Sequence, residues 1–105
     1  MKVDVDAPLV DTARALAEPM RWRIVELLAV EELCVCHLVE ELDVPQPLVS
    51  HHLKVLRDAG LVESSKFRYW TYYRLLSAPV AEAGRALLQL AERAPSGGDR
   101  RRPCC

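Results

Sequence analysis

The sequence contains no hydrophobic run long enough to act as a secretion signal or to cross a lipid bilayer. It also lacks a glycine-rich phosphate loop, and no spacing of its polar residues suggests a nucleophile, a base and an orienting group. Internal repeats are absent, and low-complexity sequence is confined to the C-terminal tail. We therefore expect a cytoplasmic protein that is not an enzyme and has no membrane partner.

Neither sign of charge is in excess, because 14 basic and 15 acidic side chains leave a net charge of -1. The charges are unevenly distributed along the chain. Residues 1–45 carry ten acidic and four basic side chains, whereas residues 46–74 carry five basic and two acidic ones. A polyanion responds to the local field rather than to the net charge. The middle of the chain is therefore a possible DNA-binding surface.

Cysteine is scarce, but the four cysteines form two close pairs, Cys34 with Cys36 and Cys104 with Cys105. A reducing cytoplasm keeps cysteines as thiols, and close pairs are typical of metal or redox sites rather than of a disulfide framework. The first pair lies in the stretch "LCVCHL", where His37 follows directly. We expect free thiols here, at or just before the start of a helix.

Hydrophobic periodicity predicts helices at about residues 9–17, 19–30, 34–42, 45–60 and 79–93. Prolines at positions 19, 45 and 47 fit only near helix starts, because proline lacks the amide that an interior position needs. Gly60 is a natural helix stop, and Asp43 can adopt the left-handed conformation that a tight corner needs.

The stretch after Gly60 is rich in Val, Thr, Trp and Tyr, which predicts a two-stranded hairpin with its turn near Lys66 to Arg68. The expected fold is mainly α with a small β-hairpin, a winged helix-turn-helix of about five helices and two strands. Residues 1–93 would form this winged helix-turn-helix domain, and residues 94–105 a flexible tail.

The helix over residues 45–60 has one apolar and one polar face. Val49, Leu53 and Leu56 share the apolar face, and the opposite arc suits the major groove of duplex DNA, with the hairpin against phosphates. The predicted base contacts are Gln46, Ser50 and His51, and the predicted backbone contacts are Lys54, Arg57, Lys66 and Arg68. A merely solvated helix face would show the same pattern, so this alternative stays open.

Two segments are specific enough to indicate a family: "ELCVCHL" at residues 32–38 and "SHHLKVLRDAGLV" at residues 50–62. They resemble the thiol sensing site and the recognition helix of the ArsR/SmtB family of metal-responsive winged-helix repressors. The resemblance covers about residues 9–92. It implies a homodimer, built from the first and last helices, that binds an inverted-repeat operator and leaves it when a toxic ion binds. The small apolar stripe of the last helix fits a dimer.

The chemistry of soft ligands indicates that Cys34 and Cys36 are metal ligands. Thiolates prefer arsenite, antimonite, cadmium, lead, zinc or copper(I) to hard cytoplasmic cations, and the positive end of the following helix favours the thiolate form. Metal capture would then pull on the helix that packs against the recognition helix. Alternatively, the two cysteines are small hydrophobic residues that fill gaps in the core.

The resemblance is incomplete, because arsenite-sensing members usually show CxCxxC and Val39 occupies the third position here. The third ligand would come from His37, which would suit zinc, nickel or copper, or from Cys104 and Cys105, which a flexible tail can bring to the site. Alternatively, His37 faces solvent, and the tail thiols are incidental or prone to oxidation. A metal site between the last helices is not expected, because residues 79–93 contain no His.

The expected function is a metal- or metalloid-responsive repressor with double-stranded operator DNA as partner and arsenite or antimonite as the favoured inducer. Cadmium, zinc, lead and nickel remain alternative inducers. A thiol redox switch on the same scaffold is a second hypothesis, and a protein-interaction module is a third. Activation of transcription is an alternative to repression.

Overall fold

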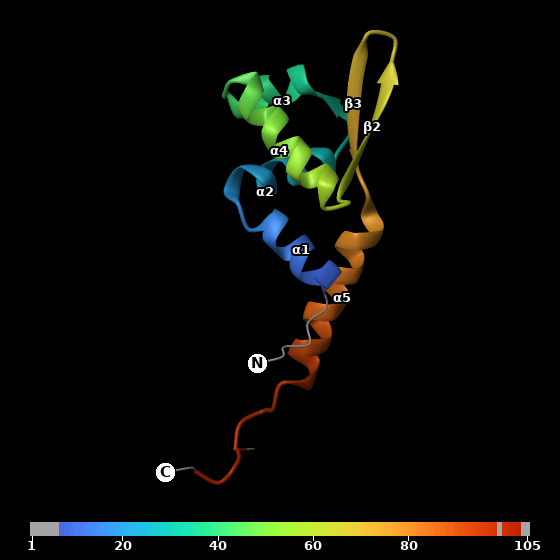
Figure 1. Ribbon diagram of the computed structural model, residues 1–105. Helices are drawn as coiled ribbons and strands as arrows, with labels where there is room; N and C mark the ends of the chain where they lie inside the picture. The colour runs from blue at the N-terminus through green and yellow to red at the C-terminus, as the bar shows by residue number, and fades with distance from the viewer. Residues whose placement is uncertain (1–6, 99, 104–105) are drawn as a thin grey trace.

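The computed structural model describes residues 7–98 and 100–103, which form a winged helix-turn-helix (Figure 1). Within these residues the helices are α1 (Ala7–Leu16), α2 (Pro19–Leu28), α3 (Val35–Leu42), α4 (Gln46–Asp58) and α5 (Ser77–Arg93). The strands are β1 (Leu33–Cys34), β2 (Val62–Phe67) and β3 (Trp70–Leu75). The predicted fold class and the five predicted helices are confirmed.

Prolines and one acidic side chain set the helix starts. Pro19 occupies the first turn of α2, and the Glu18 carboxylate caps this helix by accepting the backbone N–H of Arg21 at 2.9 Å. Pro45 is the extended residue before α4, and Pro47 lies in the first turn, where no amide hydrogen bond is lost. The helix starts predicted from the prolines are therefore confirmed.

Two residues with positive φ set the path of the chain around α4. Asp43, at the corner between α3 and α4, has φ 53°, and its backbone N–H donates to the carbonyl of Val39 at 2.9 Å. Gly60, just after α4, has φ 77° and turns the chain towards β2. Both match the sequence-based expectation.

The core lies between α2, α3, α4 and the base of the sheet. Its largest fully buried side chains are Ile24, Leu38, Val49, Leu53, Leu56, Leu61 and Val62. Burial of each such side chain stabilises the fold by roughly 1.5–3 kcal/mol. Three of them form the predicted apolar face of α4, so packing fixes the opposite, polar face of this helix towards solvent.

The sheet has three strands rather than the two that the sequence predicts. β1 pairs antiparallel with β3, with Leu33 opposite Tyr73 and Cys34 opposite Tyr72, and β2 pairs with the other edge of β3. β2 and β3 form the wing, and its turn follows Phe67, with Arg68 at φ 57°. The turn therefore lies at the end of the predicted interval.

Helices α1 and α5 pack against each other at the end of the molecule opposite the wing tip (Figure 1). α1 buries Thr12 and Ala15, whereas α5 buries none of its residues within this chain. None of the helices among the described residues is long and apolar enough to cross a membrane. Among residues 7–98 and 100–103, α5 packs mainly against α1, and Leu87, Leu88 and Leu90 of this helix stay exposed.

Candidate functional site

Cys34 and Cys36 lie where β1 ends and α3 begins. Cys34 is the last residue of β1 and the N-cap of α3, and Cys36 lies in the first turn of that helix. The two side chains are joined by a disulfide, with their Cα atoms 5.5 Å apart. The expectation of free thiols is therefore wrong for this pair. The disulfide can form because the strand-to-helix junction brings both sulfurs to the same side of the chain.

His37 completes a cluster with the two cysteines. Its Nδ1 accepts the backbone N–H of Cys34 at 3.1 Å and lies 3.3 Å from the Cys34 sulfur. One potential ligand atom from each of the three residues lies within 4.8 Å of the others. Cys34 is buried, His37 is half-buried and Cys36 is exposed, so solvent reaches the cluster through Cys36. The structure thus brings these three predicted ligands together.

The donor set fits a thiophilic ion once the disulfide is reduced. Two thiolates and one imidazole are soft and borderline donors, which suit arsenite, cadmium, zinc or lead and not magnesium or calcium. His37 must give up its bond to the Cys34 N–H if Nδ1 is to act as a ligand. The other two predicted ligands, Cys104 and Cys105, lie outside the described residues.

The predicted DNA-binding side chains lie on α4 and the wing, and all of them are exposed: Gln46, Ser50, His51, Lys54, Arg57, Lys66 and Arg68. Lys54 forms an ion pair with Asp58 at 2.8 Å, and this hydrogen bond lowers the pKa of the Asp58 carboxyl group. A phosphate would have to compete with Asp58 for Lys54. The exposed arc and the basic wing suit duplex DNA.

The wing tip carries aromatic residues that the sequence analysis did not assign to the site. Tyr69 is 95% exposed, and the side chains of Phe67 and Trp70 are also exposed. The Arg68 guanidinium lies over the Phe67 ring, 5.7 Å from its centroid. Three aromatic residues within four positions beside a turn, in "KFRYW", are the sequence signal that would have identified them.

His52 does not belong to the exposed arc of α4. It is buried, and its Nδ1 lies 3.2 Å from a guanidinium nitrogen of Arg21 and 3.7 Å from the Glu18 carboxylate. Burial is the main cause of its lowered pKa; Glu18 opposes this shift, and Arg21 adds to it. Arg21 also donates to the carbonyl of Ala15 at 2.7 Å, so this junction ties α1 and α2 to α4.

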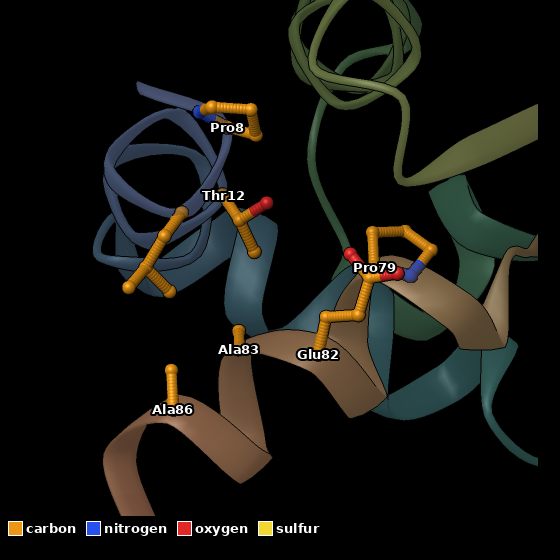
Figure 2. A pocket seen from close by; sticks show the side chains of 7 residues that line it. Pro8, Thr12, Pro79, Glu82, Ala83 and Ala86 are labelled. Atoms are coloured by element: carbon orange, nitrogen blue, oxygen red, sulfur yellow. The ribbon is translucent and has the colours of Figure 1, made fainter. Parts of the chain in front are cut away.

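The surface between α1 and α5 is hollowed. Figure 2 shows Pro8 and Thr12 of α1 facing Ala83 and Ala86 of α5, with Glu82 at the margin. A neighbouring groove is lined almost wholly by apolar side chains, Leu9, Val10, Thr12, Ala13, Leu16, Ala17, Trp22, Ala83 and Leu87. Further along α5, Leu87, Leu88 and Leu90 are each more than half exposed. An apolar surface of this kind suits a protein partner.

Comparisons with known proteins agree with this geometry. Residues 18–64 match the model of the bacterial regulatory protein arsR family. An uncharacterised HTH-type transcriptional regulator of Methanocaldococcus jannaschii is 40% identical over 70 residues, which are 66% of this chain and 79% of that protein. The arsenical resistance operon repressor of Escherichia coli is 46% identical over 63 residues, 59% of this chain and 54% of that repressor. The chain thus matches only about half of the E. coli repressor.

Solved structures show the same fold. An ArsR-like transcriptional regulator from Rhodococcus has a TM-score of 0.74 at 30% identity, over 82% of this chain and 81% of that one. Reduced HlyU from Vibrio cholerae has a TM-score of 0.67 at 33% identity, over 83% of this chain and 87% of that one. By sequence and by fold, this chain belongs to the ArsR family of bacterial transcriptional regulators.

Proposed function

We propose that the protein binds operator DNA as a homodimer and leaves it when a thiophilic ion, with arsenite the favoured one, binds at Cys34, Cys36 and His37. The observation that carries this proposal is the position of the three-residue cluster at the start of α3. α3 packs directly against α4, which presents the exposed polar arc. A change at the cluster therefore acts on the neighbour of the proposed DNA-reading helix.

The chemistry of the cluster supports arsenite or another soft ion. The reduced pair supplies two thiolates to arsenite, and His37, the nearest further donor among the described residues, would add an imidazole for an ion such as zinc. The arsenical repressor of E. coli, a relative over half of its length, supports the same choice. Because two thiols are already held on one short segment, chelation loses little chain entropy.

The DNA-binding half of the proposal uses α4 and the wing. The polar face of α4 would enter the major groove, with Gln46, Ser50 and His51 near bases, while basic residues of α4 and the wing contact phosphates. The apolar surface of α1 and α5 supports a dimer, which would place two such helices on one inverted repeat. Allosteric coupling of ordinary size would weaken operator binding about 5- to 150-fold.

Titration of arsenite, and separately of cadmium, against the protein on an operator fragment under reducing conditions tests this function. We expect the double variant Cys34→Ser with Cys36→Ser to keep operator affinity and to lose the response to both ions. The matched control is a chain lacking Cys104 and Cys105, which should respond as the intact chain does if the tail is not a ligand. Unchanged release in the double variant would rule out Cys34 and Cys36 as the sensor.

A second candidate function is redox sensing by the same pair, because the structure holds Cys34 and Cys36 as a disulfide. The similarity of this chain to the solved structure of reduced HlyU also supports redox sensing. Hydrogen peroxide would take two electrons and two protons from the dithiol, which leaves the disulfide and two waters. Operator release by peroxide without any ion, reversed by a dithiol reductant, would favour this function over ion sensing.

A further inference from the structure

The third strand of the sheet connects the cysteine cluster to the wing. Cys34 is opposite Tyr72 in the pairing of β1 with β3, and Tyr72 is opposite Ser65 in the pairing of β3 with β2. Side chains opposite each other in a sheet lie on the same face, and so do residues two apart in a strand. The cluster residue Cys34 therefore shares one sheet face with Tyr72, Phe67 and Trp70.

Ring contacts continue this connection to the wing tip. The centroid of the Tyr72 ring lies 6.0 Å from that of His37 and 6.4 Å from that of Phe67, with the two benzene rings edge to face. The Arg68 guanidinium in turn lies over the Phe67 ring. Among the described residues, Tyr72 is thus the one residue of the wing whose ring contacts both His37 of the cysteine cluster and Phe67 near the wing tip.

We propose that Tyr72 is a positioning residue that couples the state of the Cys34, Cys36 and His37 cluster to the wing. This inference rests on the proposed function and adds a second route to DNA beside the packing of α3 on α4. His37 Nδ1 accepts a hydrogen bond from the Cys34 N–H, so the imidazole must give up this bond and reorient if Nδ1 is to become a ligand. Its ring then changes its contact with Tyr72, and Phe67 and Arg68 follow at the wing tip.

The space beside Tyr72 allows such a movement. A groove next to the ring is lined by Glu32, Ser65, Lys66, Phe67 and Tyr72. The ring itself is half-buried, and the wing beyond it is exposed, so few contacts oppose a shift there. Lys66, a proposed phosphate contact, lines the same groove. Rotation of Tyr72 would therefore move both aromatic and basic groups of the wing.

Trp70 of the wing provides a direct reporter. In a Trp22→Phe background it is the single tryptophan, and it lies opposite Phe67 in the sheet. Cadmium is added to the reduced, DNA-free protein while thiolate absorption measures ion binding. We expect cadmium to change the emission of Trp70 in the Trp22→Phe protein, and also when Tyr72→Phe, which keeps the ring, is added to it. When Tyr72→Leu is added instead, cadmium should no longer change the emission, although the protein should bind cadmium with an affinity within about twofold of the parent.

Operator release provides the second readout. Tyr72→Leu should reduce the ratio of ion-free to ion-bound operator affinity by about threefold or more, a sizeable share of an ordinary allosteric coupling. Tyr69→Leu is the matched control, because it removes a wing aromatic that has no ring contact with His37 in the described chain; its ratio should stay unchanged.

The two readouts separate the failure of this inference from the failure of the proposed function. An unchanged Trp70 response in Tyr72→Leu, or no Trp70 response in the parent while cadmium is bound, would overturn the role of Tyr72. If cadmium and arsenite bind but the parent stays on its operator, the proposed function is wrong. The Trp70 measurement then still decides whether Tyr72 couples the cluster to the wing.

Discussion

At the scale of single residues, adjacent histidines on α4 have opposite roles. His51 is exposed on the polar arc, whereas His52 is buried at the junction with Arg21 and Glu18. Helical geometry separates neighbouring residues by about 100°, which turns His52 towards the core edge. The sequence therefore predicts the burial of His52. It does not predict the contact with Arg21, because that partner is 31 residues away.

The lowered pKa of His52 predicts a pH dependence of stability. Its ordinary pKa is 6.5, and burial lowers it in the folded state, so the unfolded chain binds more protons as the pH falls below about 6.5. The free energy of unfolding should therefore decrease on acidification from that point down to the lowered pKa. The slope due to His52 cannot exceed about 1.4 kcal/mol per pH unit, the limit for one proton.

Urea unfolding of the intact chain and of His52→Gln at a series of pH values, on both sides of the ordinary pKa of 6.5, measures this effect. We expect His52→Gln to flatten the dependence. His51→Gln serves as the comparison; the charge of His51 is the smallest cause of the lowered His52 pKa, so this variant should keep most of the slope of the parent. Equal slopes in the parent and in His52→Gln would show that His52 does not cause the acid sensitivity.

At the scale of elements, the corner between α3 and α4 depends on a left-handed residue. Asp43 has φ 53°, which side chains other than Gly and Asn adopt at a cost. Asp43→Val should lower the free energy of unfolding by about 1–2 kcal/mol, because a β-branched residue is strained there. Asp43→Gly should leave stability equal or higher. Chemical denaturation of the three proteins measures the difference, and a Val variant as stable as the parent would contradict it.

The same scale shows which elements a sequence can predict. Each helix spans enough residues to display its apolar spacing, and Pro19, Pro47 and Gly60 mark boundaries by their backbone restrictions alone. β1 has two residues, too few to show any alternation, and its partners on β3 lie almost forty positions away. Local spacing predicts the cysteine cluster but not its connection to Tyr72, because that connection depends on the pairing of β1 with β3 and on the contact between the His37 and Tyr72 rings.

At the scale of the whole molecule, the described chain exposes two surfaces that the proposed function would use. The α4 arc and the wing lie towards one end, and α1 with α5 towards the other (Figure 1). Residues 46–74, which include α4 and the wing, carry five basic and two acidic side chains, although the net charge of the chain is -1. Local charge and exposed apolar area, rather than overall composition, therefore indicate the partners.

The apolar surface of α1 and α5 predicts a dimer that a paired substitution should dissociate. Leu87 lines the groove with α1, and Leu90 lies one helical turn further along the same side of α5; both are more than half exposed. Leu87→Glu with Leu90→Glu would place charges in a surface that a second copy must desolvate. We expect sedimentation to show a monomer with helical content intact, because α5 buries no residue within its own chain.

Loss of the dimer should weaken operator binding, because two linked α4 helices gain affinity from binding two half-sites at once. We expect a loss on the order of 100-fold for an inverted repeat and a much smaller loss for a single half-site. Gln89→Glu is the matched control, since Gln89 is an exposed polar residue of the same helix and lies about 200° from Leu87 around it. A dimeric Leu87→Glu, Leu90→Glu variant, or equal losses on both DNA fragments, would show that this face does not join two copies on DNA.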